Sequence, residues 1–565
     1  MGKITKLSIQ GYRSINERIE IRFPLKQPVV LVGENNAGKS NIVKALQLVM
    51  GPSWPGSYDP ADHEFFARDN SRPIEIEVEF DDSALLGGKF KQVRWRYNPS
   101  ASDPVYFRGF DLDIYNGSKG NGRNIRSEDR DTCICMVVEA ERSLQYHLSY
   151  SSKWTLLSRL MHRFHRALSG NQAVKGELED LFRQVKSKFH EIQEFKGFLD
   201  GLQQELSDLF GSMSHRLDVD FEAYNPVNFF HALRLQAAEG NEPRTLDEMG
   251  TGEQQVLALA FAYAYAKAFH GGIILVIEEP EAHLHPLAQQ WLARRLRSRC
   301  EEELQIVITT HSPTFLSIEG LEGLVLVYKD KGATHVRQIT KQELVQHCIN
   351  HGAPRDRVTK SNILPFYAAS ATSEILSGFF ARVVVLVEGQ TEALALPILL
   401  RKVGLDVEKE GIAILSVGGK GNLGKWYRLF TAYDIPCYVV FDNDSTDDRQ
   451  AEKRRDALRA IGMKDEQQIK SVIEEEGWEI SDSYTVFGKD YETTMREYFA
   501  KYNELEQRAR EEEGIDTKPF VARWVAEKLL KDSGDKGWDK LTVMAEKLRS
   551  KLAPRSKLTR LEDPV

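Results

Sequence analysis

The stretch that most constrains the fold of this chain is VVLVGENNAGKSNIVKAL, residues 29–46. Four apolar residues predict a buried strand, a loop follows in which a glycine and four residues precede Gly-Lys-Ser, and the next apolar residues have helical spacing. In this order the glycines let backbone N–H groups surround phosphates, Lys39 reaches the outer phosphates and Ser40 binds Mg²⁺. The sequence therefore predicts an α/β domain that binds a nucleotide. The predicted contacts are Gly33, Asn36, Gly38, Lys39, Ser40 and Asn41.

Two further apolar runs, each ending in a polar residue, extend the predicted nucleotide site. GGIILVIEEPEAHLHP, residues 271–286, predicts a buried strand that ends at Glu278 and Glu279. One acid there can hold the metal ion, and the next, Glu279, can polarise the attacking water. LQIVITTHSP, residues 304–313, predicts a strand that ends at His311. In isolation this histidine would be read as a core residue, but in this order of motifs we expect it to sense the γ-phosphate.

A fourth segment carries the signature of one ATPase class. DEMGTGEQQVLALAFAYAYA, residues 247–266, places Gly252 and Glu253 where ABC-type ATPases contact the nucleotide of the opposite subunit. Together with the GYRSI start, which contains Arg13, the motifs resemble the ATPase heads of the SMC, Rad50 and RecF group. The segment DPADHEFF, residues 59–66, is our candidate for the Q-loop. A signature that acts in trans implies at least a homodimer.

A helical insert is expected between these motifs, at about residues 140–215. Apolar residues recur every three or four positions across 174–210, which is helical spacing. Gly176, Gly197 and Gly201 favour two or three helices over one unbroken helix. The apolar face either packs within its own domain or holds two copies of the chain together. We prefer dimerisation.

The second half of the chain repeats the pattern of a buried strand that ends in acid. VVVLVEGQTEALALPIL, residues 383–399, runs from a strand directly into Glu388, and Glu392 follows in the first turn of a predicted helix. Ligands of open α/β sheets bind at the carboxyl ends of the strands, so both carboxylates can face one cavity. Taken alone, however, Glu392 could merely complement the helix dipole and Glu388 could merely end the strand. We place the boundary between the two domains near residue 370.

A third strand supplies more acids. IPCYVVFDNDSTDDRQ, residues 435–450, ends its apolar run at Asp442 and Asp444. Two residues apart on an extended chain, these side chains should point to the same side and converge with Glu388 and Glu392. Oxygen ligands of this kind bind Mg²⁺ or Mn²⁺. The loop SVGGKG, residues 416–421, is the expected backbone contact of a phosphate.

An acid at a strand end followed by Asp-x-Asp is the Toprim pattern, and here an ABC-type head precedes it. The whole chain resembles the OLD (overcoming lysogenization defect) family of ATPase/Toprim nucleases, to which the GajA subunit of the Gabija antiphage system also belongs. The resemblance implies two further site elements. Asp490 and Glu492 in TVFGKDYETTM would be metal ligands, and Lys518 in DTKPFVARWVAEKL would be a catalytic lysine.

With the boundary near residue 370, we expect an ATPase domain at 1–370 and a Toprim nuclease domain with a helical C-terminal part at 371–565. The resemblance also implies the function of the chain: ATP binding and hydrolysis, together with two-metal hydrolysis of DNA in antiphage defence. The predicted catalytic residues are Glu388, Asp442, Asp444, Lys518 and, for ATP, Glu279. The predicted metal ligands are Glu388, Glu392, Asp442, Asp444, Asp490, Glu492 and Ser40. Expected partners are DNA, further copies of the chain and a protein or nucleic acid encoded nearby.

Composition and length argue against several other functions for the chain. The 565 residues include five scattered cysteines, which form no zinc pattern and argue against a primase. No apolar run is long enough to span a membrane and no secretion signal is evident, so we expect a cytoplasmic protein without a membrane partner. A topoisomerase would need a large domain for its tyrosine. The net charge of −8 requires any DNA contact to be local, and the tail at 547–560, with six basic residues, is either that contact or a solvated end. The remaining alternative is a nucleotide-gated DNA-binding scaffold without nuclease activity.

Overall fold

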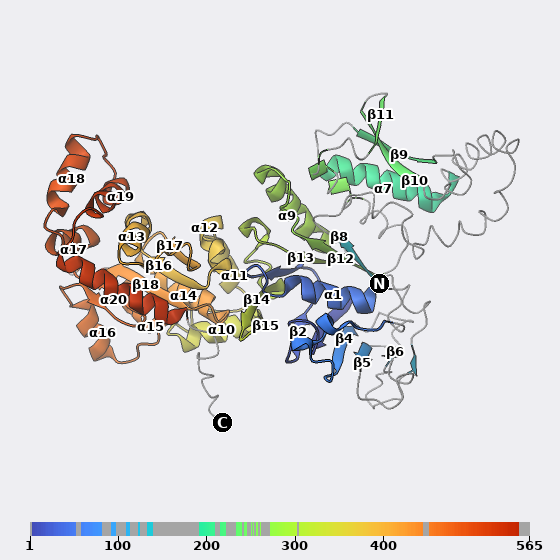
Figure 1. Cartoon of the computed structure of the whole chain (residues 1–565), viewed down its shortest axis with the longest axis horizontal. Helices are drawn as coiled ribbons and strands as arrows, with labels where there is room; N and C mark the ends of the chain where they lie inside the picture. The colour runs from blue at the N-terminus through green and yellow to red at the C-terminus, as the bar shows by residue number, and fades with distance from the viewer. Residues whose placement is uncertain are drawn as a thin grey trace, which may run out of the picture. The chain divides into compact units, whose positions relative to one another are not determined.

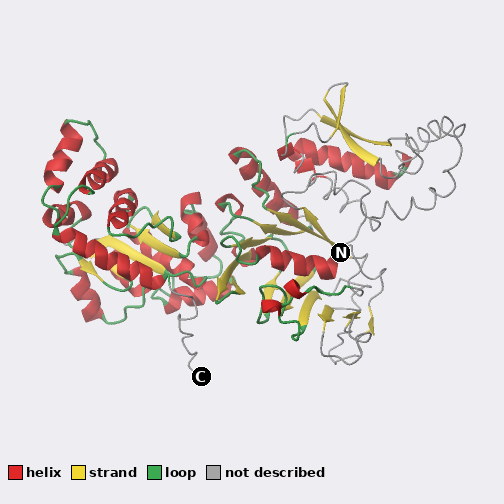
Figure 2. Ribbon diagram, viewed as in Figure 1, coloured by secondary structure: helices red, strands yellow, loops and turns green. Residues whose placement is uncertain are grey.

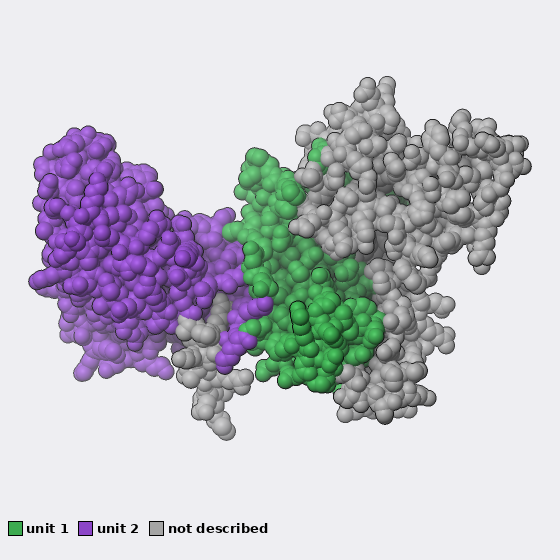
Figure 3. All heavy atoms as spheres, in the orientation of Figure 1, with its two compact units in different colours: residues 1–31, 35–315, 332–336 green, residues 32–34, 316–331, 337–565 purple. Residues whose placement is uncertain are grey.

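The computed structural model divides into two compact units (Figure 3). Unit 1 comprises residues 1–31, 35–315 and 332–336, and unit 2 comprises 32–34, 316–331 and 337–565. The predicted boundary near residue 370, between independently folding domains, stays a prediction. The structure describes residues 3–51, 58–81, 92–97, 109–112, 123–124, 133–138, 191–209, 215–221, 233–239, 242–245, 250, 252–253, 256–257, 260, 272–301, 304–444 and 451–552.

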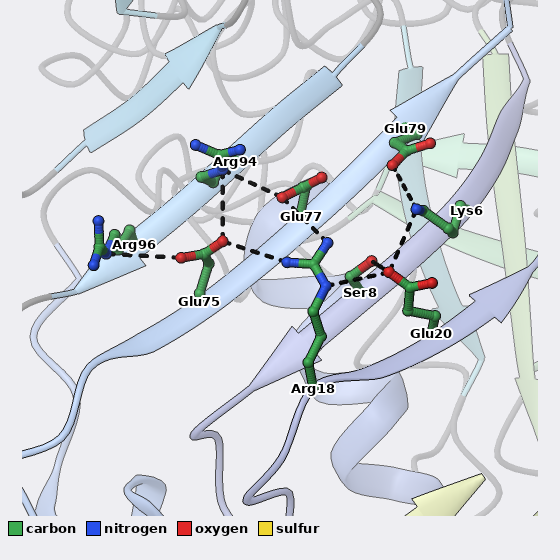
Figure 4. A network of polar contacts seen from close by, with 9 residues as sticks. All are labelled: Lys6, Ser8, Arg18, Glu20, Glu75, Glu77, Glu79, Arg94 and Arg96. Carbon is green, nitrogen blue, oxygen red and sulfur yellow. Dashed lines mark hydrogen bonds and ion pairs between the residues drawn. The ribbon is translucent and has the colours of Figure 1, made fainter. Parts of the chain in front are cut away.

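The first sheet of unit 1 is antiparallel, in the order β2-β1-β4-β5-β6-β7. In β4 every second residue is apolar and buried, from Ile74 to Phe80, so one face of the sheet lies on the core. The intervening acids of β4 pair with basic side chains of the neighbouring strands, for example Lys6 with Glu79 at 2.8 Å and Arg94 with Glu77 at 3.3 Å (Figure 4). Such cross-strand pairs fix the strand register. The strands are β1 Ile4–Gln10, β2 Ile19–Arg22, β4 Ile74–Phe80, β5 Gln92–Tyr97, β6 Gly109–Leu112 and β7 Arg123–Asn124.

The second sheet of unit 1 contains the predicted nucleotide-site strands. β3 Val29–Val32, β13 Gln305–Thr309, β12 Gly272–Glu278 and β8 Cys133–Val138 are neighbours in that order, and all are parallel. The described side chains of β3 and β13 are buried throughout, as expected when both faces of a parallel sheet are covered. Helix α1 Lys39–Met50 follows β3, and α9 Pro286–Glu301 follows β12 (Figure 1).

The described part of the predicted helical insert is one helix, α7 Gln193–Leu209. It runs without a break through Gly197 and Gly201, so neither of these glycines ends a helix; whether the whole block 174–210 forms two or three helices stays a prediction. Packing compensates for their low helix propensity, because Phe198, Leu202 and Leu206 are buried and Glu205 pairs with Arg299 of α9. Residues 140–190 lie outside the described part of the chain. A three-stranded antiparallel sheet follows, with β9 His215–Phe221, β10 Leu233–Glu239 and β11 Glu242–Thr245 in the order β11-β10-β9.

Unit 2 is built on a five-stranded sheet in the order β17-β16-β18-β20-β19. The strands are β16 Val383–Val387, β17 Ile412–Ser416, β18 Cys437–Asp442, β19 Glu479–Ile480 and β20 Tyr484–Phe487, and only β19 is antiparallel to its neighbour. Val383, Val385 and Val387 belong to a core cluster that includes side chains of α13, α19 and α20. Val384 and Leu386 are equally buried. Figure 2 shows the strands of this sheet enclosed by helices.

The helices of unit 2 cover the sheet and extend beyond it. They are α10 Lys341–Asn350, α11 Ile363–Ala368, α12 Ser373–Leu376, α13 Gln390–Lys402, α14 Leu423–Ala432, α15 Ala451–Ala460, α16 Glu466–Ile473, α17 Tyr491–Tyr498, α18 Tyr502–Glu511, α19 Lys518–Leu529 and α20 Lys536–Lys551. Strands β14 Leu324–Asp330 and β15 Ala333–Gln338 precede them. Among the helices that the structure describes, none has the length and apolar character needed to cross a membrane.

Candidate functional site

The loop after β3 has the backbone of a phosphate-binding loop. Gly33, Asn36 and Gly38 have φ angles of 149°, 64° and 110°, and Gly38 is the N-cap of α1. A Cβ atom on Gly38 would lie 2.2 Å from Thr334 Oγ1, so the position requires glycine for space as well as for conformation. Lys39 begins the helix and is 6% exposed. Backbone N–H groups at a helix N-terminus favour an anion such as a phosphate.

Side chains from outside the motif support this loop. Thr334 of β15 donates a hydrogen bond to the Ala37 carbonyl at 2.8 Å, and its hydroxyl lies 2.7 Å from Ser14 Oγ. Asn41 Nδ2 donates to Ser14 Oγ at 2.7 Å. Asn41, a predicted phosphate contact, therefore also ties α1 to the segment after β1. The sequence gives no signal for Thr334, which belongs to no recognisable motif, and within the GYRSI segment only Arg13, not Ser14, was singled out.

The strand ends beside the loop bring together three predicted nucleotide-site residues. His311 Nε2 lies 3.6 Å from Glu279 Oε1. Burial, and then the charge of Lys39, lowers the pKa of His311 below its usual value, so the neutral imidazole is favoured and can donate a hydrogen bond to phosphate. Glu279 follows β12 directly and has a φ of 48°, a left-handed conformation that is costly for a side-chain residue. Its carboxylate is half-exposed, so water can reach it.

Glu281 is a further acid that the sequence did not single out. Its carboxylate accepts hydrogen bonds from the backbone N–H of His311 at 2.6 Å and from Thr310 Oγ1 at 2.8 Å. Glu281 therefore holds the end of β13 in place rather than facing a ligand. Glu281 is one of the three acids in the run EEPEAH, but their spacing alone does not distinguish its structural role from the predicted roles of Glu278 and Glu279.

The predicted signature segment is only partly described. Gly252 packs closely against the turn after β12, since a Cβ atom there would lie 2.7 Å from the His283 carbonyl oxygen. Glu253 accepts a hydrogen bond from the Gly250 N–H at 3.1 Å. The structure thus places Gly252 beside the Glu279 turn, and the contact of Gly252 and Glu253 with a second subunit's nucleotide stays a prediction.

The candidate Q-loop segment and Arg13 are in contact with each other. Arg13 Nη2 lies 2.9 Å from Glu64 Oε1, and the hydroxyls of Tyr12 and Tyr58 also donate to the Glu64 carboxylate. Both arginine and acid are largely buried. This network links the end of the first strand to the segment 59–66. A contact of Arg13 or Glu64 with the nucleotide stays a prediction.

A second site lies at the carboxyl edge of the unit 2 sheet. Glu388 follows β16, the loop 417–421 follows β17, Asp442 ends β18 and Asp490 follows β20. Backbone hydrogen bonds connect these ends: Gly419 N–H donates to the Glu388 carbonyl, Asn443 N–H to the Phe487 carbonyl and Asp444 N–H to the Lys489 carbonyl, each at 2.8 Å. The predicted convergence of acids at one edge is therefore present in the backbone.

Lys420 lies between two of the predicted metal ligands. Its Nζ atom donates a hydrogen bond to Asp444 Oδ2 and lies 3.3 Å from Glu388 Oε2. The side chain is 3% exposed. Asp444 reaches this position through a left-handed turn with a φ of 42°, not along an extended chain as the spacing suggested. The interpretation of SVGGKG as a backbone contact overlooked the one charged side chain in that loop.

The carboxylates of this edge are electrostatically strained. Burial, and then the charges of Glu392 and Glu388, raises the pKa of Asp442 well above its usual value. Burial and the neighbouring Glu388 and Glu492 raise the pKa of Glu392 to about 7. Burial also raises the pKa of Glu388, and Lys420 offsets part of that rise. The three groups repel one another and would gain most from added positive charge.

Glu392 also has the structural role that the sequence left open. It stands at the third position of α13, where its charge complements the helix dipole, and it accepts a hydrogen bond from the Gly389 N–H at 3.2 Å. Only one of its oxygens is used in this way, and the side chain is buried next to Asp442. The helix-dipole interpretation and the site interpretation are therefore compatible.

The residues that the family resemblance added, Asp490, Glu492 and Lys518, differ in their surroundings. Glu492, in the first turn of α17, lies near Glu392, and Lys518 Nζ is 3.8 Å from Glu492 Oε1. Asp490 is the N-cap of α17, and its Oδ1 accepts a hydrogen bond from the Thr493 N–H at 2.6 Å; its role as a metal ligand stays a prediction. Lys518 begins α19 and is 72% exposed at its side chain. It therefore stands at the rim of the cluster, open to a bound substrate.

The donor set fits a hard divalent cation. Asp442 Oδ1 is a buried oxygen without a hydrogen-bond partner, Glu388 Oε2 is buried beside the Lys420 ammonium group, and carboxylate oxygens are the ligands that Mg²⁺ and Mn²⁺ prefer. Within the described residues, however, no three His, Cys, Asp or Glu side chains are already arranged to hold an ion. The position of Lys420 gives a physical reason, because Glu388 and Asp444 are oriented around its ammonium group.

Asn443, between the two aspartates, was also missed. It is completely buried, and its amide donates to the carbonyls of Val472 and Glu475 at 2.7 and 2.8 Å. These bonds anchor the end of β18 to the end of α16. A polar residue between two acids looks like part of the site in the sequence, but here it positions the backbone that carries them.

Comparison with protein families matches both halves of the chain. Residues 379–444 match the Toprim domain of overcoming lysogenization defect-like proteins. Residues 2–152 match an AAA ATPase domain and residues 144–317 match a further AAA domain. The predicted fold class, an ATPase domain followed by a Toprim α/β domain, is confirmed.

Relatives match most of the chain at modest identity. The chain is 28% identical over 472 residues to the OLD nuclease of Thermus scotoductus, which covers 80% of this chain and 84% of that protein. It is 22% identical to the Old nuclease of Escherichia phage P2, over 78% of this chain and 77% of that one. Endonuclease GajA of Bacillus cereus is 21% identical, over 74% and 71%. The predicted resemblance is thereby confirmed.

Solved structures of SMC heads also resemble the chain. The head of an Smc protein bound to the C-winged helix domain of ScpA has a TM-score of 0.41 at 20% identity, and covers 61% of this chain and 99% of that one. The SMC head domain from Thermotoga maritima has a TM-score of 0.33 at 15% identity, and covers 60% and 99%.

Proposed function

We propose that the protein is an ATP-binding and ATP-hydrolysing DNA endonuclease whose nuclease site is the carboxylate cluster of unit 2. The observation that carries the proposal is the convergence of Glu388, Glu392 and Asp442, with raised pKa values, at the carboxyl edge of the unit 2 sheet, where Asp442 Oδ1 is buried without a hydrogen-bond partner. Relatives that match most of the chain are named as nucleases. The proposed substrate is DNA, and the proposed biological role, antiphage defence, rests on the resemblance to the OLD family alone.

The cluster would hold Mg²⁺ or Mn²⁺ through Glu388, Asp442 and Asp444 on one side and Glu392 and Glu492 on the other. Such ions lower the pKa of bound water and stabilise the leaving oxygen. In the reaction, water adds to phosphorus, the phosphorus–oxygen ester bond breaks and the leaving oxygen takes up a proton. Lys518, exposed beside Glu492, can approach a phosphate oxygen and neutralise charge that develops there. No covalent intermediate with the protein is needed.

The unit 1 site would bind and hydrolyse ATP. The loop from Gly33 to Asn41 offers backbone N–H groups and Lys39 to the phosphates, and Ser40 with Glu278 would hold Mg²⁺. Glu279, half-exposed, can orient water, and neutral His311 can donate to the γ-phosphate. Completion of this site by Gly252 and Glu253 of another copy would require a homodimer or higher oligomer. The helical insert is our candidate for the contact between copies.

Substitution of the strand-end acids tests the nuclease proposal. Glu388→Ala and Asp442→Ala should each reduce nicking of supercoiled plasmid with Mn²⁺ or Mg²⁺ by at least about 10² to 10³, the cost of losing one transition-state stabiliser. The double variant should be little worse, since residues that act as a unit are not additive. ATP hydrolysis should persist in all three variants.

Glu408→Ala is the matched control, because Glu408 is an exposed acid of the same unit outside the cluster. Its preparation should nick plasmid as the wild type does, which also controls for contaminating nuclease. Near wild-type nicking by Glu388→Ala would contradict the nuclease assignment. It would favour the alternative, a nucleotide-gated DNA-binding scaffold in which Lys420 pairs the acids for structural reasons.

A further inference from the structure

The strongest unexplained feature of unit 2 is the buried cation in the carboxylate cluster. Lys420 is 4% exposed and contacts carboxylates from two different strand ends, Glu388 after β16 and Asp444 after β18. Burying an ammonium group is costly unless it is paired. Here both partners are residues that the proposed function assigns to a divalent ion. The lysine and the ion would therefore compete for the same oxygens.

The loop that carries Lys420 has a fixed backbone and open space around its two glycines. Gly418 and Gly419 have φ angles of 70° and 114°, and a Cβ atom on either would meet no atom within 4 Å. The loop is fixed at its ends by the Gly419 N–H bond to the Glu388 carbonyl and by Asn422, whose amide donates to the Val417 carbonyl at 2.9 Å. A long flexible stem on an uncrowded glycine loop can move its charged end while the backbone stays in place.

We propose that Lys420 is the built-in counter-cation of the carboxylate cluster, and that a divalent ion must displace its ammonium group to bind there. Lys420 is thus a positioning residue for the acids. This inference rests on the proposed function, because that function assigns the divalent ion to the same acids. The charge of Lys420 keeps Glu388 and Asp444 oriented toward one point. The same charge sets the metal concentration at which the site becomes occupied.

The two roles predict opposite effects of one substitution. A purely structural lysine, when replaced, would leave a less stable protein that binds the ion less well or equally well. A competing lysine, when replaced, leaves a protein that is less stable without metal, since the acids lose their counter-charge, but that binds the ion more tightly. Metal affinity and metal-free stability therefore separate the two explanations.

The test uses the full chain stripped of metal, without nucleotide and without DNA. Mn²⁺ is titrated into wild type, Lys420→Met and Lys420→Arg, and free Mn²⁺ is measured by electron paramagnetic resonance; the melting temperature is measured at each concentration. Lys420→Met should melt lower without metal and bind Mn²⁺ more tightly by about tenfold or more, a factor equivalent to about 1.4 kcal/mol. Lys420→Arg keeps the charge and should remain close to wild type in affinity.

A folded Lys420→Met protein that binds Mn²⁺ as weakly as wild type, or more weakly, would overturn the proposal. The result is independent of DNA cleavage. If Glu388→Ala abolishes nicking while Lys420→Met leaves metal affinity unchanged, the proposed function stands and only this inference fails. If wild type binds no Mn²⁺ and nicks no DNA, both fail.

A measurement on the unmodified chain keeps the proposal testable should Lys420→Met not fold. Reductive dimethylation of lysines, followed by mass spectrometry of peptides, reports which ammonium groups are accessible. Lys420 should be protected in the metal-stripped protein and should become reactive on addition of Mn²⁺. Lys425 is the internal control, because it is equally buried, donates to the Phe366 carbonyl and Ser370 Oγ, and lies away from the acids. Unchanged protection of Lys420 at saturating Mn²⁺ would contradict displacement.

Discussion

At the scale of single residues, backbone conformation and space together decide what the phosphate-binding loop tolerates. Gly38→Ala should lose nucleotide binding and destabilise the protein. The φ of 110° costs about 1–2 kcal/mol for any side chain, and the clash with Thr334 adds about 1–3 kcal/mol as overpacking. Thermal unfolding and binding of a fluorescent ATP analogue measure the two effects.

Gly534→Ala is the matched control for that substitution. Gly534 has a similar φ of 103°, but an added Cβ atom would meet nothing within 4 Å. The control should therefore show the conformational cost alone and retain nucleotide binding. Equal destabilisation by the two substitutions would mean that Thr334 moves aside, and that its hydroxyl does not fix the loop.

Single-residue roles in the two sites could be predicted only where a motif defines them. Lys39 and Glu388 were identified because each stands at a fixed place after a buried strand. The sequence does not reveal the role of Lys420, because its partners are 24 and 32 positions away and the direction of its side chain depends on two glycine φ angles. Asp490 was assigned to the site from its motif, although its carboxylate is used as a helix cap.

At the scale of elements, α10 and α14 pack through a histidine that the site does not use. His347 Nε2 lies 3.0 Å from Thr431 Oγ1, and its ring stacks on His351 at 4.0 Å between centroids. Burial, and then the neighbouring His351, Arg337 and Arg428, lowers the pKa of His347 from 6.5 to about 3. The folded protein therefore keeps this histidine neutral at pH values where the unfolded chain protonates it.

The sign of the resulting pH dependence follows from that difference. As the pH falls below 6.5 the unfolded state binds the extra proton, so this residue's contribution to the free energy of unfolding decreases by about 1.4 kcal/mol per pH unit until about pH 3. His347→Gln should remove that contribution. Between pH 6.5 and 5, the stability of unit 2 in urea should fall by about 2 kcal/mol less in the variant than in wild type. Parallel pH profiles would show that His347 titrates normally in the folded protein.

Elements were predicted best where one short pattern determines them. The apolar runs at 383–387 and 437–442 correspond to β16 and β18, because a strand buried on both faces must be apolar at every position. The glycines of the block 174–210 favour several helices because propensity is local, whereas the packing of Leu202 and the pairing of Glu205 with Arg299 of α9, which accompany the uninterrupted helix α7, are not local. The acids of β4 alternate with buried apolar residues, as in a half-buried strand. Which basic residues of β1 and β5 lie beside these acids depends on the order of the strands in the sheet (Figure 4).

At the scale of the whole molecule, the two candidate sites belong to different compact units. Lys39, Glu279 and His311 are in unit 1, whereas Glu388, Lys420 and Asp442 are in unit 2. Each unit has its own buried core. No side chain of the carboxylate cluster is supplied by the nucleotide-site motifs, so the chemistry of DNA cleavage needs none of them directly.

Separation of the two activities is therefore the expected behaviour. Lys39→Ala should abolish ATP binding and hydrolysis, because the only lysine of the phosphate-binding motif is lost, while metal-dependent nicking of naked plasmid survives at least in part. Lys44→Ala is the control: Lys44 lies on the same helix, α1, but is exposed, and its loss should change neither activity. Both activities are assayed on the same folded preparations. If Lys39→Ala loses nicking completely while Lys44→Ala keeps it, the carboxylate cluster works only when unit 1 holds its nucleotide, and the two units form one obligatorily coupled machine.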